Sequence, residues 1–102
     1  MQRSYRRPFV QFVKKARKPL QLAIEDAVEE VCAAPVIGAR KLGDLNHMRV
    51  YKFKFQRQEY LIAYETIDDF GRDVSLSIIF YQIGPHENFY EDLKNYTKQT
   101  KN

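Results

Sequence analysis

The sequence predicts a single α+β domain, with a pair of N-terminal helices packed on one face of a small antiparallel sheet and a helix at the C-terminus. Apolar residues recur at helical spacing in the first third of the chain, alternate as in strands in the middle, and return to helical spacing at the end. The 102 residues, 44% of them hydrophobic, suffice for one core of two layers. We therefore interpret residues 1–102 as one domain.

Two helices separated by a proline are expected before residue 35. Pro8 suits a first helical turn, where its missing N–H has no partner in any case. Pro19 ends this helix and starts the next, because the residue before a proline avoids the helical region. The second helix should end near Ala34, with Cys32 as a small core residue. The short polar stretch Gln2 to Arg7 is expected to be a brief edge strand.

A β-hairpin is predicted at the centre of the chain, in residues 49–64. Two alternating runs flank a polar connection at Gln56-Arg57-Gln58. In the first run, aromatic side chains point to one face while Lys52 and Lys54 point to the other. This strand should therefore pack a core on one side and present cations on the other.

The segments around the hairpin complete the prediction. Residues 35–48 contain Gly38, Gly43 and Asn46 and are typical of a loop. Residues 74–83 are rich in β-branched and aromatic side chains and predict a buried strand, and a last helix should follow from His86.

Charge is distributed unevenly although the formal net charge is only +4. Residues 2–18 hold seven basic side chains and no acidic one, and residues 40–57 hold six more against Asp44 alone. Between these segments, residues 25–30 contain four acidic side chains. This separation predicts a polyanionic partner, nucleic acid first, on one side of the molecule.

Several classes of site are not indicated. The lone Cys32 rules out an internal disulfide and fits a reducing cytoplasm. His47 and His86 lack metal-ligand spacing, and no glycine-rich phosphate loop is present, so we expect neither a metal nor a cofactor. No apolar run approaches the roughly 20 residues that a membrane-spanning helix needs.

Three motifs follow one another in the second half of the chain. They are Tyr-Lys-Phe-Lys-Phe at residues 51–55, Tyr-Leu-Ile-Ala-Tyr at 60–64 and Gly-Pro-His-Glu-Asn-Phe-Tyr at 84–90. Together with the helical hairpin before them, they resemble the RelE/ParE superfamily of bacterial toxins, from about Pro8 to Lys94. The resemblance implies a RelE-like fold and a cytoplasmic toxin of a type II toxin–antitoxin system, neutralised by a cognate antitoxin.

Two mechanisms occur in that superfamily. RelE-like members cleave mRNA in the ribosomal A site, with ribosome and mRNA as partners, whereas ParE-like members inhibit DNA gyrase and lack the nuclease residues. Lys52 and Lys54 match two basic residues of the RelE site, His86 lies near the basic position after the last strand, and Tyr90 matches a tyrosine of the C-terminal segment. Leu61 departs from the pattern, because RelE has an arginine there.

Metal-independent RNA cleavage requires these residue types. The 2′-hydroxyl attacks the adjacent phosphate, so the site needs a base, cations for the developing charge and an acid for the 5′-oxygen. Lys52 and Lys54 should lie roughly 7 Å apart, and each disfavours the charged form of the other. A histidine can serve as acid or base, so His86 is a candidate for either role, and Tyr90 can stack on a base or orient the phosphate. Further candidates for phosphate binding are Arg40, Lys41, Arg49 and Arg57.

The sequence thus favours a ribosome-dependent endoribonuclease and leaves two alternatives. One is a non-catalytic gyrase inhibitor, which Leu61 favours. The other is an inactive member that serves as an antitoxin-binding co-repressor. His86 also has an ordinary interpretation as a helix-start residue, and Tyr90 as a core residue.

Overall fold

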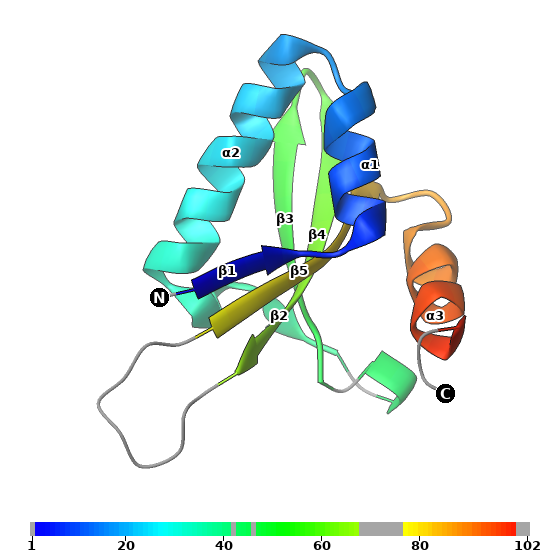
Figure 1. Ribbon diagram of the computed structural model, residues 1–102. Helices are drawn as coiled ribbons and strands as arrows, with labels where there is room; N and C mark the ends of the chain where they lie inside the picture. Colours follow the sequence, from blue (N-terminus) through cyan, green and yellow to red (C-terminus); the bar gives the residue numbers. More distant parts are fainter. Residues whose placement is uncertain (1, 42, 46, 68–76, 100–102) are drawn as a thin grey trace.

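The protein has three α-helices and a five-stranded sheet within the residues that the structure describes (Figure 1). The structure is a computed structural model and describes residues 2–41, 43–45, 47–67 and 77–99. The elements run in the order β1 (Gln2–Tyr5), α1 (Arg7–Lys15), α2 (Lys18–Ala33), η1 (Pro35–Ile37), β2 (Ala39–Arg40), η2 (Gly43–Leu45), β3 (Arg49–Phe55), β4 (Gln58–Ile67), β5 (Ser77–Pro85) and α3 (Phe89–Gln99). The α+β class and a C-terminal helix are confirmed.

The sheet has the strand order β1-β5-β4-β3-β2. Three of its pairings are antiparallel, and β1 pairs with β5 in parallel. The sheet is therefore mostly antiparallel, as the sequence predicted, with one parallel pairing that was not predicted. A parallel neighbour requires a crossover, and here the crossover is long, because α1, α2, β3 and β4 all intervene. The predicted edge strand at Gln2 to Arg7 is confirmed as β1, with bounds Gln2–Tyr5.

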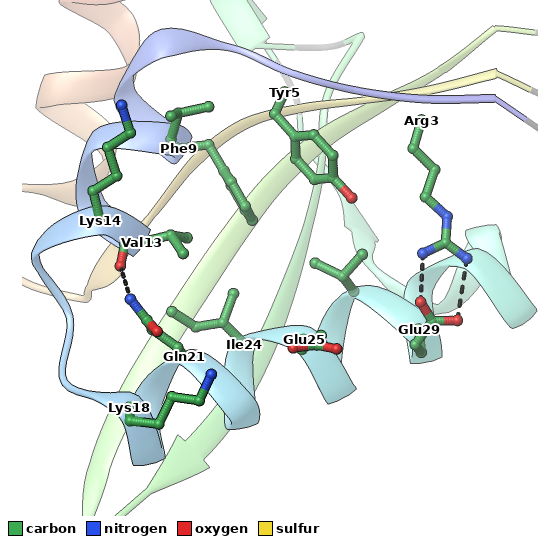
Figure 2. A pocket seen from close by; sticks show the side chains of 12 residues that line it. Arg3, Tyr5, Phe9, Val13, Lys14, Lys18, Gln21, Ile24, Glu25 and Glu29 are labelled. Atoms are coloured by element: carbon green, nitrogen blue, oxygen red, sulfur yellow. Dashed lines mark hydrogen bonds and ion pairs between the residues drawn. The ribbon is translucent and has the colours of Figure 1, made fainter.

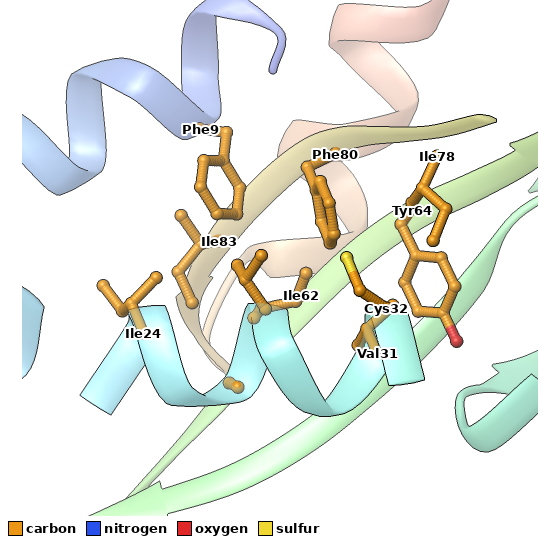
Figure 3. Close-up of a cluster of buried hydrophobic side chains, with 11 residues drawn as sticks. Phe9, Ile24, Val31, Cys32, Ile62, Tyr64, Ile78, Phe80 and Ile83 are labelled. Atoms are coloured by element: carbon orange, nitrogen blue, oxygen red, sulfur yellow. The ribbon is translucent and has the colours of Figure 1, made fainter. Parts of the chain in front are cut away.

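The helical hairpin of α1 and α2 covers one face of the sheet. Figure 3 shows Ile24, Val31 and Cys32 of α2 packed against Ile62 and other residues of the sheet. Phe9 of α1 belongs to the same cluster, and the aromatic side chains of β3 pack at its edge. Cys32 is buried there, as the sequence predicted for a core residue. We call this side of the sheet the hairpin face.

The opposite face carries a second core, so the prediction that the helices cover only one face was wrong. Phe89 and Leu93 of α3 pack against Leu61 and Ala63 of β4, and the cluster also contains Leu45, Met48 and Val50. Because side chains alternate along a strand, Leu61 and Ala63 point away from Ile62 and Tyr64. We call this side the α3 face.

The predicted loop at residues 35–48 contains short elements. The two-residue strand β2 pairs with β3, and single 3₁₀ turns precede and follow it. The first part of the strand predicted at residues 74–83 lies outside the described residues, and β5 continues to Pro85.

Candidate functional site

Lys52 and Lys54 are exposed on β3, as the alternation of the sequence predicted. Both belong to the α3 face, because the intervening Tyr51 and Phe53 pack against the core of the hairpin face. The strand reverses in a two-residue turn in which Gln56 has φ 50° and Arg57 has φ 67°. Arg57 is therefore exposed at the tip of the hairpin, beyond the two lysines.

Leu61 is the direct cross-strand neighbour of Lys52, and Gly84 lies beside it on β5. The Leu61 side chain is 0% exposed and packs in the cluster with Phe89 and Leu93. The sequence had suggested an open face at which a cation in place of Leu61 could reach a phosphate. That expectation was wrong, because α3 and its apolar side chains cover this position.

Three of the candidate residues meet beside the start of α3. The Lys41 ammonium nitrogen lies 4.9 Å from the centroid of the Tyr90 ring, a cation–π arrangement. The His86 ring approaches the same tyrosine edge-on, with 6.0 Å between ring centroids. Tyr90 is half-buried and packs against the core of the α3 face, while His86 is exposed. We call Lys41, His86 and Tyr90 the aromatic–cation cluster.

The strand register places Lys54 at the same end of the sheet as His86. Lys54 pairs with Glu59, and the next residue, Tyr60, pairs with Pro85, the residue before His86. Lys52 and Lys54 therefore lie on the same sheet face as His86 and Tyr90, whereas Lys41 follows β2 at the opposite end of β3. This face thus carries a histidine and ammonium groups, the types of side chain that can act as acid, base and charge-stabilising cation in RNA cleavage.

Acidic side chains also border this region. Glu59 stands directly opposite Lys54, and the first turn of α3 carries Glu91 and Asp92. The carboxylates of Glu91 and Asp92 weaken the attraction of the N-terminus of α3 for an anion. Sequence inspection singled out the cations alone and missed Glu59, although a glutamate flanking a lysine-bearing hairpin was a usable signal.

Arg40 and Arg49 lie apart from the other candidates. They are cross-strand neighbours of each other, and Arg49 also pairs with Tyr64, whose side chain belongs to the hairpin face. The Arg49 guanidinium donates hydrogen bonds to the backbone oxygens of Gly38 at 2.8 Å and Val36 at 3.3 Å. Arg49 is thus engaged with the backbone, and its predicted role in phosphate binding remains a prediction.

A concave surface lies between β1 and the helical hairpin, with a volume of about 410 Å³ (Figure 2). Apolar side chains such as Tyr5, Phe9 and Ile24 line it, and charged residues surround them. Arg3 and Glu29 form an ion pair with two hydrogen bonds at one end, which lowers the pKa of the Glu29 carboxyl. We call this surface the β1 groove.

Among the described residues, no group of three or more histidine, cysteine, aspartate or glutamate side chains could hold a metal ion. No helix in that part of the chain is long and apolar enough to cross a membrane.

The structure is thus a small α+β domain with exposed lysines on the α3 face of its sheet. The family described as "ParE-like toxin of type II bacterial toxin-antitoxin system" matches residues 4–94. The chain belongs to this family, which confirms the resemblance to RelE/ParE toxins. Membership implies an antitoxin partner. No curated protein and no solved structure gave a match.

Proposed function

We propose that this toxin is a ribosome-dependent mRNA endonuclease with a RelE-like arrangement of its active site, acting in the cytoplasm. The observation that carries the proposal is that the exposed Lys52 and Lys54 share the α3 face with His86 and Tyr90. A toxin that only binds a protein target has no need for a histidine on the same sheet face as exposed lysines. RNA cleavage uses all of them.

The proposed reaction is a transesterification that needs no metal. A base removes the proton of the 2′-hydroxyl, and the 2′-oxygen forms a bond to the adjacent phosphorus. The bond from phosphorus to the 5′-oxygen breaks, and an acid protonates that leaving oxygen. The products are a 2′,3′-cyclic phosphate and a 5′-hydroxyl end.

The roles follow from the chemistry of each side chain. One of Lys52 and Lys54 serves as base while the other stabilises the charge that develops on the phosphate. His86 donates the proton to the leaving oxygen. Tyr90 stacks on a base next to the scissile bond. Lys41, held over the Tyr90 ring, supplies the cation that RelE places at the position of Leu61.

A second candidate function has its own support. The buried Leu61 removes one expected cation from the RelE pattern, and the chain belongs to a family described as ParE-like. Both observations favour a toxin that binds and inhibits DNA gyrase. In that case the exposed lysines would bind an acidic surface of the target, and a substitution of His86 would leave the toxicity unchanged.

We also propose that the antitoxin uses the β1 groove. An antitoxin segment that is disordered alone can fold on an apolar groove and bury its own apolar side chains there. The Lys14 and Lys18 side chains at the rim suit an acidic segment. The α3 face with Lys52 and Lys54 would remain free for a second contact with the antitoxin.

Induction of the toxin in cells separates the two candidate functions. We expect translation to stop and new 5′-hydroxyl ends to appear within translated mRNA, while plasmid supercoiling stays unchanged. Loss of negative supercoiling with intact mRNA would assign the protein to the gyrase-inhibiting branch. Coexpression of the neighbouring antitoxin gene should restore growth in either case and serves as the control.

A further inference from the structure

The segment that leads to Lys41 is held by a tyrosine from the middle of β4. The Tyr64 hydroxyl donates a hydrogen bond to the backbone oxygen of Pro35 at 2.7 Å. The same hydroxyl accepts a hydrogen bond from the backbone N–H of Gly38 at 2.9 Å. One side chain thus joins both ends of the segment from Pro35 to Gly38, which lies between α2 and β2.

Arg49, the cross-strand neighbour of Tyr64, binds the same turn from the adjacent strand. The Arg49 guanidinium donates hydrogen bonds to the backbone oxygens of Val36 and Gly38. Tyr64 and Arg49 together therefore make four hydrogen bonds to this segment. Gly38 therefore has both its backbone N–H and its backbone oxygen bonded to side chains of the sheet.

The backbone at Gly38 lies very close to the Tyr64 side chain. A Cβ atom at Gly38 would lie 2.6 Å from the Tyr64 hydroxyl oxygen and 2.9 Å from its Cε1 atom, so only glycine fits without a shift. Tyr64 itself is buried against Phe80, with its hydroxyl pointing away from the apolar cluster (Figure 3). Its burial raises the pKa of the phenol, which therefore stays protonated as a hydrogen-bond donor.

Only two residues separate Gly38 from Lys41. They form β2, in which Ala39 and Arg40 pair with β3. The Lys41 backbone N–H then donates to the Met48 oxygen at 3.1 Å, and its ammonium nitrogen lies over the Tyr90 ring. The turn at Gly38 and the Lys41 backbone are thus connected by a short, hydrogen-bonded strand.

We propose that Tyr64 is a positioning residue for the candidate site: its two hydrogen bonds fix where the chain enters β2 and thereby hold Lys41 over Tyr90. The effect on RNA cleavage rests on the proposed function. The effect on the contact between Lys41 and Tyr90 does not.

Tyr64→Phe removes the hydroxyl and keeps the packed ring. The test by NMR is the chemical shift of the Lys41 ε-methylene group, which the Tyr90 ring current moves upfield. Tyr90→Leu gives the value without a ring. We expect Tyr64→Phe to move the Lys41 signal most of the way to that value. Tyr51→Phe is the matched control, because the Tyr51 hydroxyl on the same sheet face has no hydrogen bond within the described residues.

A second variant reaches the same turn from the main chain. Gly38→Ala places a methyl group against the intact Tyr64 hydroxyl and should shift the Lys41 signal in the same direction. An unchanged Lys41 signal in both Tyr64→Phe and Gly38→Ala would overturn the proposal.

RNA cleavage provides the functional measurement. A small misplacement of a catalytic group can lower a rate by up to about 100-fold, so we expect Tyr64→Phe to reduce cleavage by about tenfold or more. In a Lys41→Gln background, Tyr64→Phe should have no further effect, because both changes then act on the same contact. Equal losses in both backgrounds would show a merely structural role and overturn the proposal. If the wild-type protein does not cleave RNA, the proposed function fails, and the NMR measurement still decides the role of Tyr64.

Discussion

Lys54 of β3 and Glu59 of β4 are direct cross-strand partners on the α3 face. An opposite-charge pair at such positions contributes roughly 0.2–1 kcal/mol to the stability of the sheet. The same carboxylate also lowers the positive potential that Lys54 offers to a phosphate. Stability and nucleic-acid binding should therefore respond to this pair in opposite directions.

Glu59→Gln tests this opposition. We expect the free energy of unfolding to fall by about 0.2–1 kcal/mol, and the affinity for single-stranded RNA to rise at low salt, with a steeper dependence on salt concentration. Urea unfolding and binding titrations at several salt concentrations measure the two effects. Glu30→Gln, at an exposed position of α2, is the control, since it changes the net charge equally. An equal gain in affinity from both variants would show that the position of Glu59 is unimportant.

Lys54→Ala and His86→Ala should abolish growth inhibition. The loss of a group that transfers a proton typically lowers a rate by about 10²–10⁴-fold. Because both side chains are exposed, we expect both variants to stay folded and to bind the antitoxin, with the unfolding midpoint nearly unchanged for His86→Ala and lowered for Lys54→Ala only by the loss of its pair with Glu59. Growth curves after induction, together with cleavage rates of the purified variants, provide the measurement. Arg17→Ala removes a charge at an exposed position away from the α3 face and should remain toxic. Full toxicity of both site variants would show that Lys54 and His86 take no part in the reaction.

Leu61→Arg should unfold the protein instead of improving cleavage. Leu61 is fully buried beneath α3, and an unpaired charge in an apolar core is strongly destabilising. We expect a loss of more than about 3 kcal/mol, comparable with the largest effects of buried-charge substitutions. The measurement is the yield of soluble protein and its urea unfolding curve. Leu22→Arg, at a position that is 49% exposed on α2, should change stability by less than about 0.5 kcal/mol. A stable and more active Leu61→Arg variant would show that α3 leaves this face.

Alkaline pH should destabilise the protein through Tyr64. Burial raises the pKa of the folded phenol above its ordinary value of 10.0. Between that ordinary value and the raised value, the unfolded chain releases the proton while the folded protein keeps it, so unfolding becomes easier as pH rises. The stability that the protonated Tyr64 phenol contributes is fully present below pH 10 and is lost as the pH rises through the raised pKa of the folded protein. Urea unfolding between pH 9 and 11 should therefore show a weaker pH dependence for Tyr64→Phe than for the wild type. Identical pH dependence would contradict this role of burial.

The sequence was informative wherever the pattern is local. Proline positions and apolar spacing located both helices of the hairpin within two residues, and the alternation at residues 51–55 correctly predicted that Lys52 and Lys54 are exposed on β3. The two-residue turn at Gln56 and Arg57 was placed correctly but read as one residue longer. These features depend on near neighbours, which is why they are readable from a single sequence.

The position of α3 was missed although the sequence held a signal for it. Leu61, Ile62, Ala63 and Tyr64 form a continuous apolar run, and such a strand is typically covered on both faces. A second layer opposite the hairpin was therefore predictable. The pairing of β1 with β5 and the contacts of Tyr64 with Pro35 and Gly38 were not, because they join residues far apart in the chain without a local pattern.

The most direct test of the proposed function is a paired assay with the purified toxin. Ribosomes programmed with end-labelled mRNA, and DNA gyrase with relaxed plasmid, are each incubated with wild-type toxin and with His86→Ala. We expect the wild type to cut the mRNA within the ribosomal A site, leaving a 5′-hydroxyl end, and His86→Ala to cut at least about 100-fold more slowly. Gyrase should supercoil its plasmid normally in both cases. Intact mRNA together with inhibited gyrase, equally for both proteins, would contradict the account.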